Sequence, residues 1–327
     1  MDFKYTHIEG ISSVVPKRTV NNDIFSFFSS KERKFFEKTV GIFERRWTDD
    51  NQNTTKLAFE AALSLIKDLS IQDNLDSIKQ IIFVSQTPDQ QIPFTSNILQ
   101  GMLQLSNEIL AIDMNSGCSG FIQSLTSGFS LNSGLNNNER TLIVLSENLS
   151  KRLNLSDKST SPLFGDGAAA IMLKKSKDII VNSSTINNSD GLKGKAISLD
   201  LDSSSKLAMN GAEVFDFTLN EVVKGFKTFF EKKAINLSDV DYFLFHQSNN
   251  FIISQFRTIL NLPQNKILTN IQNFGNTSSV SIPLLISDKL YDKKVNTVLM
   301  SGYGSGLNWG NFHTSLAHCK ISKPRFL

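Results

Sequence analysis

Cysteine is scarce in this sequence: only Cys118 and Cys319 occur among 327 residues. They form no Cys-x-x-Cys pair, and no histidine cluster at metal-ligand spacing accompanies them. A disulfide framework needs several paired cysteines, and a zinc site needs closely spaced ligands. The sequence therefore favours neither, and we expect no bound metal.

Long apolar runs and a strong charge of one sign are also missing. No stretch approaches the ~20 apolar residues that span a bilayer, and residues 1–7 lack the apolar core of a signal peptide. The sequence thus predicts a cytoplasmic protein without membrane insertion. Lys and Arg (34) exceed Asp and Glu (31) by only +3, and the excess is spread along the chain, which argues against a nucleic-acid partner.

The remaining composition is that of a folded protein. Hydrophobic residues make up 40% and charged residues 20% of the chain, close to globular averages. A length of 327 residues provides about two domains' worth of material, or one large domain with a doubled core.

Two parts of the chain repeat one order of elements: a strand, a small polar cluster, a helix, a run of tiny residues, a second helix and another strand. In the first part these are 80–84, 85–89, 96–105, 115–120, 121–131 and 141–145; in the second they are 241–245, 246–250, 251–260, 275–279, 280–290 and 297–300. Ser85 precedes Cys118 by 33 residues, and His246 precedes Asn276 by 30. The nearly equal spacing predicts an α/β protein built from two similar halves.

We place the N-terminal half, which carries Cys118, at residues 1–174 and the C-terminal half, which carries His246, at 175–327. Strands that alternate with helices at this spacing favour layered sheets, with strand ends and helix starts meeting between the halves. Cys118 and His246 would then face one cleft. The Ser-, Asn- and Lys-rich stretch 174–202 indicates a solvated connection, and the Phe-rich region 25–53 indicates helices and loops that cover a site.

Cys118 lies in Gly117-Cys118-Ser119-Gly120, between a predicted strand at 111–114 and a predicted helix. The positive end of a helix dipole and free backbone N–H groups favour a thiolate. We therefore expect a nucleophile with a low pKa. The local sequence fits a small buried cysteine in a tight turn equally well.

His246 follows an apolar strand, where a single histidine is often a structural residue with satisfied hydrogen bonds. The duplication, however, brings it towards Cys118 from the opposite half. Asn276 occupies in the second part the position that Cys118 occupies in the first. A Cys, a His and an Asn in one cleft form a catalytic arrangement.

Two glycine-rich loops, 164–168 and 302–306, match neither a P-loop nor a dinucleotide-binding fingerprint. We expect both to be tight turns, and backbone amides of the later loop could supply half of an oxyanion hole. Cys319, beside His318, has no supporting pattern and is expected to be a structural or surface residue.

Taken together, four motifs resemble the β-ketoacyl-acyl carrier protein synthase III family of the thiolase superfamily, in order and spacing across the whole chain. They are Gly117-Cys118-Ser119-Gly120-Phe121, His246-Gln247-Ser248-Asn249, Gly275-Asn276-Thr277-Ser278-Ser279 and Gly304-Ser305-Gly306-Leu307-Asn308-Trp309-Gly310. Residues 164–170, 213–215, 41–42 and 44–46 are also similar to family segments. The resemblance implies a five-layered αβαβα thiolase-like fold and a homodimer.

The resemblance also implies a decarboxylative Claisen condensation in fatty acid or related acyl biosynthesis, with no cofactor. Cys118 would take an acyl group from acyl-CoA, and the backbone amides of Cys118 and Ser305 would stabilise the oxyanion. Malonyl-acyl carrier protein would then lose CO2, and the enolate would attack the acyl-enzyme. His246 and Asn276 would donate hydrogen bonds to the thioester oxygen, since two neutral donors stabilise an enolate without protonating its carbon.

The resemblance further implies a substrate pocket. The residues similar to the family's pocket are Phe164, Leu207, Met209 and Tyr303, with Ile92 inserted from a dimer partner and Lys158 in contact with a phosphate. Several positions depart from the family pattern. Phe251 replaces an arginine that helps to dock the carrier protein, Phe35 a tryptophan that stacks on the CoA adenine, Thr39 an arginine and Ala212 an asparagine.

Two other functions remain open at this point. An acyltransferase would pass the acyl group from Cys118 to an amine or hydroxyl acceptor, which the altered tunnel mouth favours. A non-catalytic partner that binds acyl carriers would be expected to lack the nucleophile, which is present here.

Overall fold

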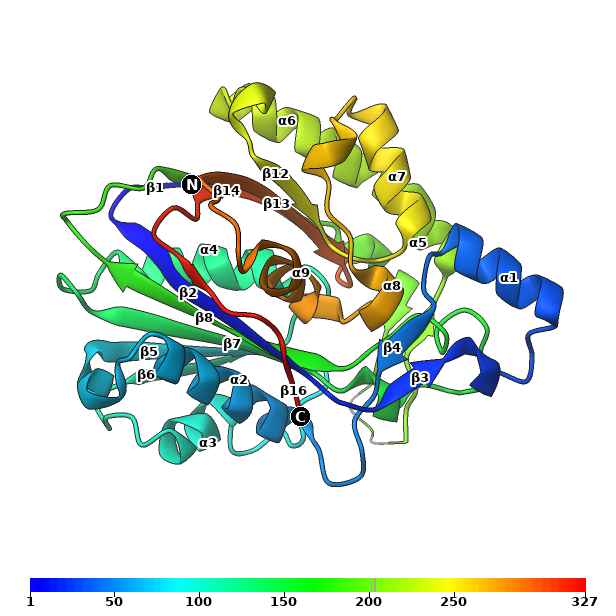
Figure 1. Cartoon of the computed structure of the whole chain (residues 1–327), viewed down its shortest axis with the longest axis horizontal. Coiled ribbons are helices and arrows are strands. Elements are labelled where there is room, and N and C mark those ends of the chain that lie inside the picture. The colour runs from blue at the N-terminus through cyan, green and yellow to red at the C-terminus, as the bar shows by residue number, and fades with distance from the viewer. Residues whose placement is uncertain (201, 203) are drawn as a thin grey trace.

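The computed structural model describes residues 1–200, 202 and 204–327, and its chain forms two twisted β-sheets with helices on and between them (Figure 1). The first sheet has the strand order β15-β2-β8-β7-β5-β6, with β16 also paired to β2. Its strands are β2 (Thr6–Val15), β5 (Ile78–Val84), β6 (Leu110–Met114), β7 (Arg140–Glu147), β8 (Gly167–Lys175), β15 (Lys320–Ile321) and β16 (Arg325–Phe326).

The second sheet has the order β1-β9-β14-β13-β12. Its strands are β1 (Asp2–Phe3), β9 (Ser183–Ser189), β12 (Tyr242–Phe245), β13 (Thr297–Gly304) and β14 (Asn308–Ser315). Two short hairpins lie outside both sheets: β3 (Thr19–Asn21) with β4 (Glu44–Arg46), and β10 (Ile197–Ser198) with β11 (Ala208–Met209).

The two sheets repeat one pairing scheme. β5 runs parallel to β7, which is antiparallel to β8, and β8 is antiparallel to β2. In the same way β12 runs parallel to β13, which is antiparallel to β14, and β14 is antiparallel to β9. Each end of the chain pairs with the sheet built mainly from the other half of the sequence. The N-terminal strand β1 joins the second sheet, whereas the C-terminal strands β15 and β16 join the first. The boundary between residues 174 and 175 stays a prediction.

Helices complete the five layers. α2 (Thr54–Asp68) and α3 (Thr95–Met102) cover the outer face of the first sheet, and α4 (Gly120–Asn132) and α9 (Ser281–Leu290) lie between the sheets. α6 (Val223–Lys233) and α7 (Asn250–Ile259) cover the second sheet (Figure 1). The predicted αβαβα thiolase-like fold is therefore confirmed.

Alternating side chains along the strands build this layering. In β7, Ile143 and Leu145 pack into the core between the sheets, whereas Leu142 and Val144 pack against the outer helices. All four are fully buried, and burial of each such side chain contributes about 1.5–3 kcal/mol. Both faces of the sheet are thus apolar, as strands between two helical layers require.

One sequence-based expectation is wrong. The stretch 174–202 is more than a solvated connection, because it contains β9, which pairs with β14. The polar side chains at the start of β9 are buried, and two of them are hydrogen-bonded: the Ser183 and Thr314 hydroxyl oxygens lie 2.7 Å apart, and the Thr185 hydroxyl donates to the carbonyl oxygen of Asn311 at 2.9 Å. Hydrogen bonds across the sheet therefore allow a polar sequence to form a buried strand.

Region 25–53 contains α1 (Ser30–Thr39) and β4. Phe25 and Trp47 from this region pack in one cluster with Phe164 and Leu207.

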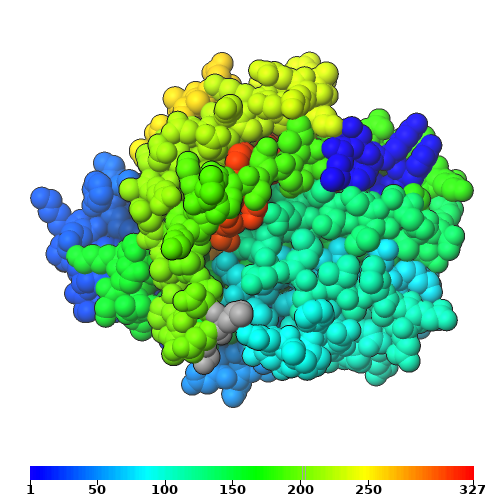
Figure 2. Space-filling model, turned by 180° about the vertical axis from the view of Figure 1, so that it is seen from behind, coloured from blue at the N-terminus to red at the C-terminus, as the bar shows by residue number. Residues whose placement is uncertain are grey.

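On the face seen from behind, residues of the C-terminal part of the chain, drawn in red, come to the surface between the cyan and the yellow-green parts of the chain (Figure 2).

Candidate active site

Three predicted residues, Cys118, His246 and Asn276, line one cavity of about 160 Å3. Cys118 lies two residues before α4, and His246 directly follows β12. Asn276 lies between α8 (Ile271–Phe274) and α9. The fold thus brings the three residues together from segments far apart in the sequence.

Cys118 is packed closely from the β13 side. A Cβ atom on Gly304 would lie 2.6 Å from the Cβ of Cys118, so only glycine leaves room for the cysteine at this point. The thiol Sγ lies 3.6 Å from the hydroxyl oxygen of Ser278, to which it donates.

The expected low pKa of the Cys118 thiol is contradicted. The pKa of Cys118 is raised to about 12, mainly by burial; the hydrogen bond to the Ser278 hydroxyl opposes this rise, and the nearby Glu147 adds to it. Burial removes the water that would solvate a thiolate, and this effect exceeds that of the nearby helix start. The resting cysteine is therefore a thiol.

His246 is fully enclosed and neutral. Its Nδ1 lies 2.7 Å from the hydroxyl oxygen of Ser281, and its backbone N–H donates to the carbonyl oxygen of Ser301 at 2.9 Å. Burial lowers the pKa of His246 to about 3, so the ring carries one proton at pH 7. Because Nδ1 faces Ser281, Nε2 is the ring nitrogen left for a bound group.

Asn276 is held by both its backbone and its side chain. Its N–H donates to the carbonyl oxygen of Leu163 at 2.8 Å, and its own carbonyl accepts from the N–H of Gly165 at 3.0 Å. The side-chain Oδ1 accepts from the N–H of Ser278 at 2.9 Å. The amide NH2 group is therefore the part of Asn276 that remains for a ligand.

The two backbone amides of the expected oxyanion hole make no hydrogen bond to the backbone. Within the part of the chain that the structure describes, neither the N–H of Cys118 nor that of Ser305 donates to a backbone carbonyl oxygen. Ser305 directly follows β13, so its amide lies on the strand end that also brings Gly304 against Cys118. Backbone amides beside a nucleophile can stabilise a developing oxyanion.

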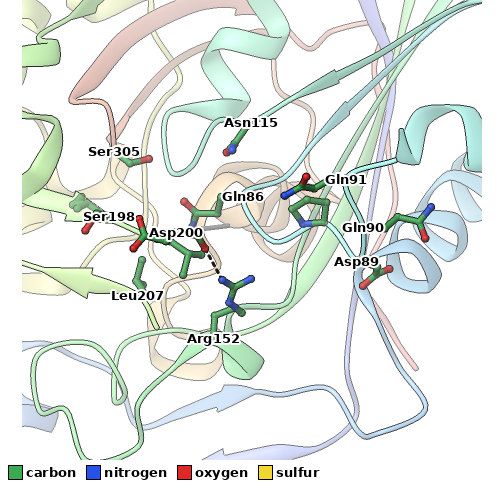
Figure 3. A pocket seen from close by; sticks show the side chains of 13 residues that line it. Gln86, Asp89, Gln90, Gln91, Asn115, Arg152, Ser198, Asp200, Leu207 and Ser305 are labelled. Carbon is green, nitrogen blue, oxygen red and sulfur yellow. Dashed lines mark hydrogen bonds between the residues drawn. The ribbon is translucent and has the colours of Figure 1, made fainter. Parts of the chain in front are cut away.

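The remaining lining is mainly apolar. Phe164, Leu207, Met209 and Tyr303 all line the cavity, as the resemblance implies. A second cavity of about 400 Å3 adjoins it through Gln86, Ile197, Leu207 and Ser305, which line both. In Figure 3, Gln86, Asn115 and Ser305 lie around this second cavity, while Asp89 and Gln90 lie on the side away from Ser305.

Two of the predicted substrate residues do not line either cavity. Ile92 is 86% exposed, next to a cis peptide bond to Pro93. Lys158 is exposed and pairs with Glu32 of α1 at 3.5 Å. Within a single chain, therefore, neither residue reaches Cys118.

Sequence reasoning missed four polar residues around the three predicted ones. Ser278 contacts Cys118, Ser281 contacts His246, and Gln86 donates through Nε2 to the Ser278 hydroxyl at 3.1 Å. Glu147, at the end of β7, is fully buried behind them. Ser278 lies in the Gly275–Ser279 motif and Ser281 two residues beyond it, so that motif was the available signal.

The side chain of Asp166 fixes the glycine-rich loop 164–168 to neighbouring segments. Its buried carboxylate accepts from the N–H of Thr48 at 2.8 Å and from the N–H of Ser150 at 2.9 Å. The loop is thus a structural junction and not a phosphate cradle.

Residues 1–200, 202 and 204–327 form neither a cluster of metal ligands nor a membrane-spanning helix. No group of three or more His, Cys, Asp or Glu side chains in these residues is placed to hold a metal ion. No helix formed by them is long and apolar enough to cross a bilayer.

The fold and the site define a thiolase-like protein whose cavity is lined by a cysteine, a neutral histidine and an asparagine. Residues 112–190 match the family model described as 3-oxoacyl-[acyl-carrier-protein (ACP)] synthase III, and residues 230–314 match the model of its C-terminal part. The chain belongs to the β-ketoacyl-acyl carrier protein synthase III family, and it is a condensing enzyme of the acyltransferase type in fatty acid biosynthesis.

Individual relatives agree with this assignment. The chain is 36% identical over 307 residues to the β-ketoacyl-[acyl-carrier-protein] synthase III of Staphylococcus aureus (strain Newman), covering 93% of this chain and 96% of the relative. A solved 3-oxoacyl-(acyl-carrier protein) synthase from Burkholderia xenovorans LB400 superposes with a TM-score of 0.94 at 32% identity, covering 100% and 98%. The synthase III of Aquifex aeolicus VF5 superposes with a TM-score of 0.85 at 27% identity, covering 95% and 99%.

Proposed function

We propose that this enzyme loads an acyl group from acyl-CoA onto Cys118 and condenses it with malonyl-acyl carrier protein. In the first step the Cys118 sulfur attacks the thioester carbonyl and CoA leaves as a thiol. In the second step the malonyl group loses CO2, and the enolate carbon attacks the acyl-Cys118 carbonyl. The products are a β-ketoacyl carrier protein and free Cys118.

The convergence of Cys118, His246 and Asn276 on one small cavity carries this proposal. Loss of CO2 places negative charge on the thioester oxygen, and neutral donors stabilise that charge without protonating the carbon. His246 is neutral because burial lowers its pKa to about 3, and the Asn276 amide cannot ionise. Both have a donor free for this oxygen, since Ser281 and the Ser278 N–H occupy their other polar atoms.

The backbone amides of Cys118 and Ser305 support the acyl-transfer half of the reaction. The tetrahedral intermediate of acyl transfer carries an oxyanion, and each well-placed donor to such an oxyanion contributes about 3–4 kcal/mol. The apolar lining by Phe164, Leu207 and Met209 suits an alkyl or pantetheine chain.

We also propose a cytoplasmic homodimer in which Ile92 of the partner subunit approaches the acyl cavity. Ile92 is 86% exposed, and the neighbouring Phe94 is 52% exposed. β6 is the last strand of the first sheet, and Leu110 at its start is 46% exposed. Apolar side chains beside an open strand edge favour burial against a second chain. Light scattering on the wild type and on the Ile92→Asp variant tests this, and a monomeric wild type contradicts it.

Intact-mass spectrometry tests the acyl loading. Wild type, Cys118→Ala and Cys319→Ala are each incubated with acetyl-, butyryl- and branched acyl-CoA. We expect the acyl mass to appear in wild type and Cys319→Ala and to be absent from Cys118→Ala. Adding malonyl-acyl carrier protein should then remove the acyl group from the enzyme and release CO2. Acylation that persists in Cys118→Ala would contradict the proposed nucleophile.

One observation keeps a second function in view. Phe251 is 41% exposed and stacks on Phe215, a residue that lines the cavity, with ring centroids 5.8 Å apart. At the position of Phe251 the resemblance implies an arginine that docks carrier protein. An acyltransferase to an amine or hydroxyl acceptor would need no carrier docking at this place. If acyl-Cys118 forms but malonyl-carrier protein never discharges it, this second function replaces the condensation.

A further inference from the structure

The cavity around Cys118 is too small for both chains that the proposed condensation brings together. Its volume of about 160 Å3 is space for roughly five water-sized groups at about 30 Å3 each. In the second step the thioester arm of the malonyl donor must reach His246 and Asn276, which line this same cavity. The acyl group on Cys118 therefore has to lie elsewhere while the donor is bound.

The adjoining cavity of about 400 Å3 offers that space, and it begins close to the nucleophile. Gln86 and Ser305 line both cavities. A Cβ atom on Gly117, the residue before Cys118, would lie 2.4 Å from Oε1 of Gln86 and 2.5 Å from Oγ of Ser305. Because consecutive Cα atoms are about 3.8 Å apart, both oxygens lie within a few carbon–carbon bonds of an acyl group on Cys118.

The lining of this second cavity combines apolar side chains with neutral polar ones. Ile197 and Leu207 supply apolar surface. Gln86, Asn115 and Ser305, which supply amide and hydroxyl groups, lie around the cavity in Figure 3. A saturated alkyl chain would contact the apolar part, but it would displace water from the polar groups and leave them without partners.

Two polar groups at the junction of the cavities remain for a substrate. Gln86 donates through Nε2 to the Ser278 hydroxyl at 3.1 Å, which leaves its Oε1 as an acceptor. The carbonyl oxygen of Ser305 accepts from Asn308 at 3.0 Å, whereas no hydrogen bond among the described residues involves the Ser305 hydroxyl. A hydroxyl on the substrate can donate to one of these groups and accept from the other at the same time.

A negatively charged acyl group fits this cavity less well than a neutral one. Arg152 lines the cavity, but it already donates from Nε to the carbonyl oxygen of Ser205 at 3.1 Å and from Nη2 to those of Asp200 and Asp202, each at 2.8 Å. The side chains of Asp89 and Asp200 bring two carboxylates to the same lining. A further carboxylate would be repelled by these charges.

We propose that Gln86 and Ser305 select short acyl groups that carry a hydroxyl on the β-carbon, with the acyl chain lying in the second cavity. The proposal rests on the acyl loading proposed above and names its substrate class. The substrate hydroxyl donates to Oε1 of Gln86 and accepts from the hydroxyl of Ser305, while the carbon chain contacts Ile197 and Leu207. A site that hydrogen-bonds a substrate hydroxyl rejects the analogue without it, because the polar groups of the site then lose their partners.

The test compares the second-order rate constants of acyl loading from butyryl-, 3-hydroxybutyryl- and succinyl-CoA, followed by intact mass. Wild type should load the better enantiomer of the 3-hydroxybutyryl group about tenfold or more faster than either of the other groups. Ser305→Ala removes the hydroxyl and keeps the backbone amide, and Gln86→Met removes the side-chain amide and keeps the chain length. Each should reduce the preference several-fold. Because the readout is a ratio of rates, a general loss of activity does not change it.

Gln90→Met is the matched control, since it makes the same substitution in the lining of the same cavity, on the side away from Ser305 (Figure 3). Its preference should equal that of wild type. Faster loading of butyryl or succinyl groups by wild type overturns the proposal, as does an unchanged preference in both Gln86→Met and Ser305→Ala. Should Gln86→Met fail to fold, Ser305→Ala decides alone.

A binding measurement separates this selection from the proposed function. The pantetheine amides of butyric and 3-hydroxybutyric acid carry the same acyl groups but do not acylate Cys118, so their Kd values, measured by calorimetry, do not depend on loading. We expect the hydroxy amide to bind about tenfold more tightly. If it does so while no acyl-CoA loads Cys118, the proposed function fails and the selection stands. Equal binding of the two amides overturns the selection, whatever the loading.

Discussion

The Nδ1 atom of His246 lies 2.7 Å from the hydroxyl oxygen of Ser281, the first residue of α9. The same hydroxyl oxygen accepts the N–H of Gln247 at 3.4 Å. An oxygen that accepts from this N–H can give its own proton to Nδ1, which then acts as an acceptor. When Ser281 donates its proton to Nδ1, the proton of the neutral ring lies on Nε2, the nitrogen that the proposed condensation needs as a donor.

We predict that Ser281→Ala slows condensation and spares acyl loading. Without the hydroxyl, the ring is free to carry its proton on Nδ1, and a wrong tautomer at a catalytic histidine lowers kcat by about tenfold or more. Ser281→Thr keeps the hydroxyl and should retain most activity. The measurements are kcat with malonyl-carrier protein and the burst of acyl-Cys118. Equal loss in both steps, or loss in Ser281→Thr as large as in Ser281→Ala, would speak against this role.

Gly304→Ala should disable acyl loading without unfolding the protein. The new Cβ would lie 2.6 Å from the Cβ of Cys118 and 3.4 Å from its Cα and N, so the cysteine and its amide must move. Misplacement of a reacting group by about 1 Å can cost about 100-fold in rate. Gly101→Ala on α3 is the matched control, because a Cβ there meets nothing within 4 Å. Acylation rates are compared by mass spectrometry, and normal loading in Gly304→Ala would contradict the expectation.

The fold could be predicted because the repeated order of elements is visible in the pattern of apolar and polar residues. Apolar strands and polar clusters recur at nearly equal spacing, and both copies form as expected around α4 and α9. β9 could not be predicted, because its Ser, Thr and Asn side chains are typical of a loop. Their cross-strand hydrogen bonds with β14 exist only once the sheet has formed.

The site could be predicted only in part. Cys118, His246 and Asn276 stand out because each lies at a strand end or helix start in a duplicated pattern. The thiol pKa could not be inferred, since local sequence indicates the nearby helix start but not the burial that outweighs it. Glu147 was equally hidden, because a glutamate at the end of an apolar strand gives no sign that Ser279 and Thr87 converge on it.

Phe251→Arg should strengthen the use of carrier protein and make it sensitive to salt. The ring of Phe251 is 41% exposed and stacks on Phe215, which lines the cavity of Cys118. A cation placed there attracts an acidic partner and raises the rate of association. Salt screens this attraction and lowers the association rate again. We expect KM for malonyl-carrier protein to fall several-fold at low salt and to return towards the wild-type value at high salt. Phe251→Leu controls for loss of the ring, and an unchanged KM in Phe251→Arg would argue against carrier docking at this mouth.

His7 makes the protein less stable in acid. Burial lowers the pKa of His7 to about 4 from an ordinary value of 6.5, so the unfolded chain binds a proton that the folded chain does not. The contribution is complete above pH 6.5 and is lost as the pH falls towards 4. Between pH 7 and 4.5 the loss amounts to about 2 kcal/mol in the free energy of unfolding. Urea unfolding of His7→Gln at both pH values should show a smaller decrease than wild type, and an identical decrease would contradict this assignment.

Arg45 supports the segment that holds Asn276, and its removal should affect one half-reaction more than the other. The buried guanidinium donates to the carbonyl oxygens of Val20 and Pro162 and to Oδ1 of Asn22. Arg45→Ala leaves these three acceptors unpaired in a dry interior, which costs about 3 kcal/mol or more. Arg45→Lys keeps the charge but loses the planar fork, so its stability should be intermediate.

The effect on catalysis follows from the neighbours of this side chain. Pro162 directly precedes Leu163, whose carbonyl accepts the Asn276 N–H at 2.8 Å. Cys118, in contrast, precedes α4 in the core between the sheets. At a temperature where Arg45→Ala is still folded, condensation should therefore fall several-fold more than acyl-Cys118 formation, as measured by separate single-turnover assays. An equal fall in both steps would mean that Arg45 maintains the whole fold and not the position of Asn276.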